Sequence, residues 1–241
     1  MNTLTLYYGD LRTRKKLAEF YLEKQKPDKA LLIAENYYQA HRNNYIIGLL
    51  YAKCLLQNQQ YSAASTLLLN VRVIPFEGAT EGRELYRQAL LLQATEQLKN
   101  KKYKTALELA NKAKAFPENL GSGKPYEADI DYRAEDYITA ICYRQTNKNE
   151  LAEKLFREIA AFPEQKNGYK ANIIIQAWAL QQSGGDATGR EWLERKLADL
   201  KDTNFAAWAL LVFNHKKEAD APSKDGNMRL QEQLAGFSRK E

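Results

Sequence analysis

The stretch LAEFYLEKQKPDKALLIAENYYQAHRNNYIIGLLYAKCLLQNQQYSAASTLLLNV, residues 17–71, contains one pattern of small and apolar residues twice. Each residue of the first copy is matched 34 positions later. The first copy is Leu17, Ala18, Tyr21, Ala30, Ala34 and Tyr37, and the second is Tyr51, Ala52, Leu55, Ala64, Leu68 and Val71. An interval of about 34 residues is the length of one helix-turn-helix repeat. Because two helices cross closely only where short side chains lie between them, the alanines predict the crossing points.

The same pattern continues along the chain, with apolar residues recurring every three or four positions as on one buried helical face. It predicts repeats over about residues 11–43, 44–76, 85–118, 133–163 and 170–200, then a helix over 203–214 and a C-terminal capping segment over 228–240. The turns within the first four repeats are expected at residues 26–28, 57–60, 100–102 and 147–149. We therefore predict an all-α fold, a right-handed α-solenoid of about five to six antiparallel helix pairs in a single domain, residues 1–241.

The repeat interval lengthens in the middle of the chain. Ala30 to Ala64 is 34 residues, Ala64 to Ala106 is 42, and Ala106 to Ala152 is 46. The additional residues fall between repeats, in 76–84 and 119–132. Since a solenoid accommodates insertions at its connections, both inserts are expected to leave the array on the same edge.

Composition limits the classes of function. The 241 residues are 44% hydrophobic and 27% charged, with a net charge of +6 and a pI near 9.1, which is ordinary for a folded soluble protein. The basic residues are spread through the chain and no nucleic-acid motif accompanies them, so a basic surface is favoured over a nucleic-acid partner. Cys54 and Cys142 fall on apolar helix faces and are predicted to be buried and unbridged.

No apolar run approaches the roughly 20 residues of a membrane span, and the N-terminal segment does not resemble a signal peptide. A cytoplasmic location is expected if Met1 is the native N-terminus, and a periplasmic location is the alternative if the sequence is a fragment.

The sequence contains no recognisable catalytic or cofactor-binding motif. The segment Gly121-Ser122-Gly123-Lys124 departs from a phosphate-binding loop, because Glu118 stands where the first glycine is required and Pro125 follows the lysine. No metal-ligand spacing and no nucleophile motif occurs. We therefore expect a non-enzyme without cofactor or metal.

Two sets of residues are candidates for binding. The first lies on the first helix of each pair, where aliphatic and single charged side chains suit an extended peptide or a neighbouring domain. These residues are Lys15, Glu19, Leu49, Lys53, Thr95, Leu98, Tyr137, Ile141 and Arg144. The alternative is that several of them only pack against the adjoining repeat.

The second set lies in and after the longer insert, where a small ligand could be held. It comprises Asn119, Lys124, Tyr126, Asp129, Asp131 and Arg133. The alternative is a glycine-rich turn that lets the insert fold back on the array.

With these residues in view, the chain resembles the tetratricopeptide superfamily over about residues 11–200. The resemblance implies a protein-interaction scaffold. In the chaperone-binding members a Lys and Asn clamp holds a terminal carboxylate; Lys15 matches that clamp, but Glu19 stands where Asn is required.

The inserts resemble segments in the repeat arrays of large Bacteroidetes proteins that also carry a galactose-mutarotase-like domain. The segments are Ile74-Pro75-Phe76-Glu77-Gly78 and Pro117-Glu118-Asn119-Leu120-Gly121-Ser122-Gly123-Lys124-Pro125-Tyr126. This resemblance covers the repeat part alone, and it implies a mutarotase-like domain of the same polypeptide as a partner.

Two functions follow as hypotheses. The first is a non-catalytic scaffold that binds a protein or peptide in its groove. The second is an accessory repeat domain of a carbohydrate-active protein, with the inserted loops contributing to a ligand site. A basic nucleic-acid adaptor is a third and weaker alternative, and a homodimer through a Leu- and Tyr-rich open end is a further alternative for the assembly.

Overall fold

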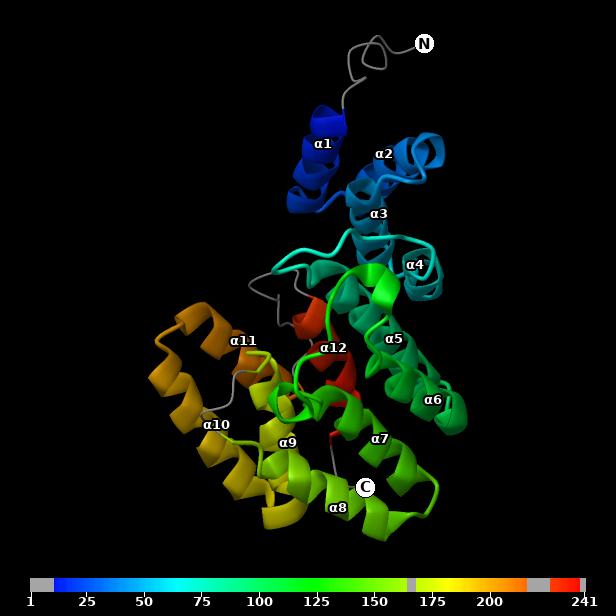
Figure 1. Cartoon of the computed structure of the whole chain (residues 1–241). Helices are drawn as coiled ribbons and strands as arrows, with labels where there is room; N and C mark the ends of the chain where they lie inside the picture. The colour runs from blue at the N-terminus through cyan, green and yellow to red at the C-terminus, as the bar shows by residue number, and fades with distance from the viewer. Residues whose placement is uncertain (1–10, 164–167, 216–225, 239–241) are drawn as a thin grey trace. The chain divides into compact units, whose positions relative to one another are not determined.

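A computed structural model describes residues 11–163, 168–215 and 226–238 of the chain (Figure 1). The described residues form helices joined by turns and loops and contain no strand. The α-helices are α1 (Leu11–Glu23), α2 (Pro27–Ala40), α3 (Tyr45–Gln57), α4 (Tyr61–Leu68), α5 (Glu81–Lys99), α6 (Tyr103–Ala113), α7 (Arg133–Gln145), α8 (Asn149–Ala160), α9 (Asn172–Gly184), α10 (Asp186–Leu200), α11 (Thr203–Phe213) and α12 (Gly226–Leu234). The described residues also form the short 3-10 helices η2 (Glu118–Leu120), η3 (Glu127–Asp129) and η4 (Ala235–Phe237).

Helices that follow one another in the chain pack against each other. The contacts join α1 to α2, α2 to α3 and α3 to α4, and later α6 to α7, α7 to α8, α8 to α9 and α9 to α10. The predicted all-α array of paired helices is therefore confirmed. The third repeat begins earlier than expected, because α5 starts at Glu81, and the last residues of the predicted capping segment lie outside the described residues.

The chain divides into two compact units. Unit 1 comprises the described residues up to Leu90 together with residues 115–124, and unit 2 comprises residues 91–114 and the described residues from Pro125 onward. The single domain over residues 1–241 remains a prediction.

The turns inside the first four helix pairs share one conformation. Each contains a non-glycine residue with positive φ: Gln25 (58°), Gln59 (59°), Lys101 (57°) and Asn147 (59°). In each turn the N–H of this residue donates to the carbonyl three positions earlier, and the next N–H donates to the carbonyl five positions before it. This is the Schellman arrangement that satisfies the last carbonyls of a helix. The repeat is thus visible in the backbone as well as in the sequence.

Small residues lie where the helices cross, as the sequence predicted. Ala18, Ala52, Ala94 and Ala140 are fully buried. Two glycines serve the same purpose: a Cβ on Gly48 would lie 2.8 Å from Val71 Cγ2, and a Cβ on Gly189 would lie 2.3 Å from the carbonyl oxygen of Ala177. Gly189 therefore allows α10 to approach α9.

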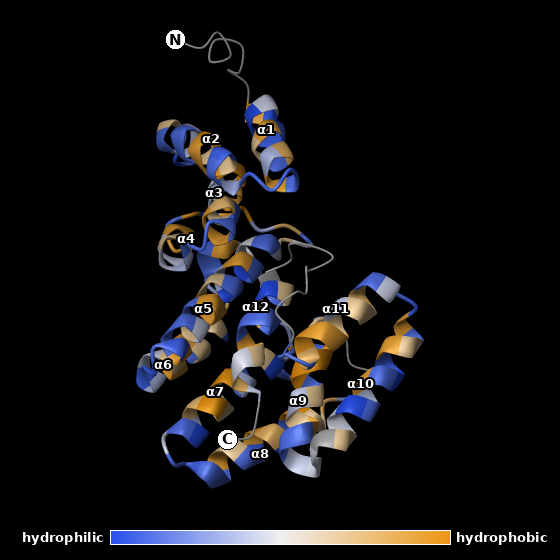
Figure 2. Cartoon of the chain, turned by 180° about the vertical axis from the view of Figure 1, so that it is seen from behind, coloured by the Kyte–Doolittle hydropathy of each residue, from blue (hydrophilic) through white to orange (hydrophobic). Residues whose placement is uncertain are grey.

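The buried core includes apolar side chains of α11 and the two cysteines. Figure 2 shows α11 as a mostly apolar helix, and its Phe205, Trp208 and Val212 side chains are buried. Cys54 and Cys142 are buried and free, as predicted. These side chains add buried apolar area, the main favourable term in folding.

Candidate functional site

A cavity of about 320 Å³ in unit 1 gathers residues from α1, α3, the loop after α4 and the first turn of α5. We call it the unit 1 groove. Four residues predicted to bind a partner line it: Lys15 and Glu19 from α1, and Leu49 and Lys53 from α3. Its other lining residues include Tyr45, Ile46, Phe76, Ala79 and Glu81.

Helical spacing brings the four predicted residues together. Lys15 and Glu19 are four positions apart, as are Leu49 and Lys53, so each pair shares one helix face. The helices α1 and α3 contact each other, so the two faces border one cavity.

The floor and the edge of the unit 1 groove are apolar. Leu49 and Leu50 are buried, whereas Ile46 and Phe76 remain 38% and 58% exposed. The sequence pattern does not mark Phe76 as a binding residue, because it stands at the start of an insert between two repeats. Its aromatic side chain in an otherwise polar insert was the available signal.

The charges in this groove balance. The Nζ atom of Lys15 lies 2.6 Å from Oε1 of Glu19, and both side chains are about two-fifths exposed. Lys53 and Glu81 are exposed. A terminal carboxylate would have to compete with Glu19 for Lys15, so this lysine does not offer the open cation of a carboxylate clamp. Cys54, next to Lys53, is not a nucleophile at neutral pH, because burial raises the pKa of its thiol to about 12.

The wall of the unit 1 groove is held by Asn119 from the second insert. Its side-chain amide donates hydrogen bonds to the carbonyl oxygens of Leu68 (2.9 Å) and Val71 (2.7 Å). Its own carbonyl accepts the N–H of Val73 at 2.8 Å. Gly121, with φ of 73°, passes so close to Val73 that an added Cβ would lie 3.1 Å from Val73 Cγ1, which leaves little room for a side chain. Asn119 thus fixes the loop that carries Phe76.

The other five predicted partner-binding residues belong to unit 2. Thr95, Leu98, Tyr137 and Ile141 are buried. Arg144 is half-buried and donates to Gln182 Oε1 at 2.7 Å and to the carbonyl oxygen of Phe237 at 3.3 Å. Ile141 and Arg144 also line a cavity of about 770 Å³ beside Phe237. These five residues do not form one exposed surface.

The six residues of the proposed insert site have separate roles. Asn119 and Lys124 belong to unit 1, and the other four belong to unit 2. Tyr126 is 85% exposed, and Asp129 is exposed as well. Asp131 and Arg133 are buried and pair with each other.

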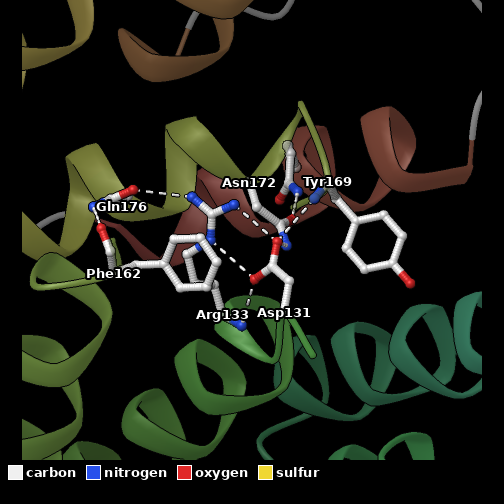
Figure 3. A network of polar contacts seen from close by, with 7 residues as sticks. Asp131, Arg133, Phe162, Tyr169, Asn172 and Gln176 are labelled. Carbon is white, nitrogen blue, oxygen red and sulfur yellow. Dashed lines mark hydrogen bonds and ion pairs between the residues drawn. The ribbon is translucent and has the colours of Figure 1, made fainter. Parts of the chain in front are cut away.

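Figure 3 shows the polar network around Asp131 and Arg133. Asp131 Oδ1 accepts from the backbone N–H (3.1 Å) and Nε (2.9 Å) of Arg133, and Oδ2 accepts from Nη2 at 2.8 Å. Oδ2 also accepts from the N–H of Tyr169 (2.9 Å) and from Asn172 Nδ2 (3.1 Å). The guanidinium reaches Gln176 Oε1 at 2.9 Å and stacks over Phe162 at 3.9 Å from the ring centre.

Electrostatics explains why Asp131 is ionised although it is buried. Burial alone would raise its pKa, but the hydrogen bonds and charge of Arg133, helped by the Tyr169 N–H, hold the pKa below its ordinary value. The carboxylate and the guanidinium are both fully engaged within the chain, so this network is built to join the start of α7 to α9 and the segment before it.

The described part of the chain contains no group of three or more His, Cys, Asp or Glu side chains that could hold a metal ion. Over the same residues, no helix has the length and apolar character needed to cross a bilayer.

Comparison with known proteins finds a likeness for part of the chain. Residues 21–72 match the family described as tetratricopeptide repeat. Neither a curated protein nor a solved structure matches the chain. The matched residues run from the end of α1 to just beyond α4 and include most of the pattern that repeats at 34 residues. The match and the repeated helix pairs together support the resemblance of this chain to the tetratricopeptide superfamily.

Proposed function

We propose that the chain is a non-catalytic protein-interaction scaffold, and that the unit 1 groove binds an extended segment of a partner protein. Tetratricopeptide repeats generally mediate protein–protein interaction, which supports the assignment of the chain as an interaction scaffold. The assignment of the unit 1 groove as the binding site rests on one observation, which is that Lys15, Glu19, Leu49 and Lys53 all line one cavity.

The size and chemistry of the groove suit a peptide. Its volume of about 320 Å³ is at the lower end of the range for ligand pockets, which corresponds to a few side chains. Leu49 forms an apolar floor, and Phe76 offers an exposed aromatic ring at the edge. Lys53 and Glu81 add one charge of each sign, which can orient a bound segment.

The second candidate, an accessory domain of a carbohydrate-active polypeptide with a mutarotase-like domain as partner, has less support. A sugar site needs several polar groups that converge on one hollow. The amide of Asn119 and the charges of Asp131 and Arg133 are instead hydrogen-bonded within the chain. The peptide groove is therefore the function we favour.

A selection experiment tests the proposal. A displayed library of random peptides is selected on the full chain, and the affinity of the recovered peptides is measured by fluorescence polarisation. Phe76→Ala and Lys53→Glu should each weaken binding by about tenfold, a difference of about 1.4 kcal/mol. Both side chains are exposed, so neither substitution should lower stability by more than about 0.5 kcal/mol.

The control is Lys104→Glu, which makes the same charge change at an exposed position of α6 in unit 2. Peptide binding that is equally strong in all three folded variants and the wild-type chain would refute the unit 1 groove as the binding site.

A further inference from the structure

The C-terminal segment of unit 2 is embedded among other helices of that unit. Figures 1 and 2 both show α12 in the interior of the drawing, and α12 contacts α9. Of its residues, Met228, Leu230, Gln231 and Leu234 are buried, with Gln231 and Leu234 fully enclosed. A surface cap would bury one side only, whereas α12 is enclosed on most of its circumference.

The helix depends on this enclosure. It has nine residues, and isolated helices of this length are marginal in water. Its helical form is therefore stabilised mainly by the surface that receives it, as for a peptide that folds when it binds.

Side chains from four other helices recognise the segment by hydrogen bonds. Within the helix, Gln231 Nε2 donates to Asn172 Oδ1 at 2.9 Å, Trp208 Nε1 donates to Glu232 Oε1 at 2.9 Å, and the Thr95 hydroxyl donates to Gln233 Oε1. After the helix, Arg144 donates to the Phe237 carbonyl, and Gln182 Nε2 donates to the Ser238 carbonyl at 2.7 Å. We call the five groups Thr95, Arg144, Asn172, Gln182 and Trp208 the α12 site.

Two of these five, Thr95 and Arg144, are residues that the sequence predicted to bind a partner. In the structure both bind the C-terminal segment of their own chain. The surface expected to hold a foreign peptide in unit 2 thus holds an internal one.

We propose that the α12 site is a second interaction surface, that α12 is its resident ligand, and that its partner is an amphipathic helix of another protein. The partner helix would carry the pattern of the enclosed face: leucines four positions apart, as Leu230 and Leu234 are, with an amide side chain beside them, as in Gln231. This proposal is independent of the unit 1 groove, because none of its residues belongs to unit 1.

The contacts of α12 are not optimal, so a helix with better contacts would bind the α12 site more tightly. The Oε1 atom of Gln231 is buried, and none of the described residues donates a hydrogen bond to it. An unsatisfied buried acceptor weakens binding. Against this, α12 belongs to the same chain as the α12 site, and ten residues of sequence separate it from His215. Covalent linkage over so few residues gives an effective concentration on the order of millimolar. A partner helix of equal fit therefore fails at micromolar concentration, and only a better-fitting helix replaces α12.

The test uses a labelled peptide of residues 226–241 added to the full chain, with binding measured by fluorescence polarisation. The tethered α12 should exclude the peptide from the wild-type chain. Leu234→Asp in the chain disrupts the tethered ligand and leaves the α12 site intact, so the peptide should bind at least about 100-fold more tightly. Gly236→Ala, at an exposed position where a Cβ meets nothing within 4 Å, is the matched control and should behave as wild type.

Two further variants define the contact. Arg144→Ala combined with Leu234→Asp should weaken peptide binding about tenfold, and a peptide that itself carries Leu234→Asp should not bind. Weak peptide binding that is equal in wild-type and folded Leu234→Asp chains would overturn the proposal.

A nicked chain covers the case in which Leu234→Asp fails to fold. A protease site placed within residues 216–225 of the otherwise wild-type chain is cleaved, and exchange of the released segment for labelled peptide is followed by gel filtration. Exchange supports the proposal, and a folded nicked chain that never takes up the peptide overturns it. If light scattering instead shows a wild-type dimer that the peptide dissociates, the site belongs to a second copy and the assignment to another protein is overturned.

Discussion

Replacing Asp131 with alanine should destabilise unit 2 more than any surface change in the same insert. The substitution removes the acceptor of five hydrogen bonds and leaves the Arg133 guanidinium buried, with Gln176 and Phe162 as its contacts. Five charge-assisted hydrogen bonds at about 1.5–3 kcal/mol each would exceed the total stability of many domains, and such terms are not additive. The cost of one unpaired buried charge, about 3–5 kcal/mol, is the appropriate magnitude.

The assay is urea unfolding at pH 7, followed by far-ultraviolet circular dichroism. The matched control is Asp129→Ala, two residues away and exposed, which should change the free energy of unfolding by less than about 0.5 kcal/mol. The double variant Asp131→Ala/Arg133→Met should lose less than Asp131→Ala alone, since it buries no unpaired charge. If Asp131→Ala and Asp129→Ala are equally stable, the reasoning is refuted.

The stabilisation that Asp131 provides has a defined pH dependence. Arg133 holds the folded-state pKa of Asp131 below its ordinary value, against the effect of burial. The unfolded chain therefore takes up the proton first as pH falls, so the stabilisation is complete above the unfolded pKa of about 4 and is lost as pH falls through the folded pKa. The stability difference between wild type and Asp131→Ala should be constant from pH 7 to about pH 5 and shrink below about pH 4.

Three further predictions concern packing and capping. Gly189→Ala places a Cβ 2.3 Å from the Ala177 carbonyl oxygen and should cost at least about 1–3 kcal/mol in urea unfolding, while Gly123→Ala, with nothing within 4 Å, should cost nothing; equal effects would contradict the close approach of α9 and α10. Asn119→Ala should cost about 1–3 kcal/mol and speed hydrogen exchange at the Val73 amide, and unchanged exchange would contradict its role in the groove wall. Asn44→Ala removes the side-chain oxygen that caps α3 and should lower stability by about 1 kcal/mol; a calorimetric scan that matches wild type would refute this.

The helix pairs were predictable because their signals are local. The alanines at 18, 52, 94 and 140 occur once in the first helix of each of the first four pairs, and all are fully buried. The turns at Gln25, Gln59, Lys101 and Asn147 lie within or beside the predicted turn segments. A repeat of this kind is stabilised by contacts with its neighbours in sequence, so its pattern is complete within about 34 residues.

The unit 1 groove was partly predictable for the same reason. Lys15, Glu19, Leu49 and Lys53 follow from helix faces, and they line one cavity. Phe76 was not predicted, because its position depends on the loop that Asn119 holds from 43 residues farther along the chain.

The roles of the unit 2 residues could not be inferred from spacing. Asp131 and Arg133 are near neighbours in sequence, but their partners Tyr169, Asn172 and Gln176 lie about 40 residues away. Likewise, the Thr95 hydroxyl donates a hydrogen bond to Gln233, which is 138 residues distant in sequence. Contacts at such separations arise from packing of the whole unit, and no local pattern in the sequence specifies them.

The four left-handed turns also offer positions at which the thermal stability of the protein can be raised. The backbone at Gln25, Gln59, Lys101 and Asn147 has a positive φ, which glycine adopts without penalty and which costs other residues about 1 kcal/mol or more. Neighbouring members of the set are at least 34 positions apart in sequence, and none lines the unit 1 groove. Replacing these four residues with glycine one after another should therefore raise the melting temperature of the protein in separate, additive steps. The unit 1 groove should stay unaltered.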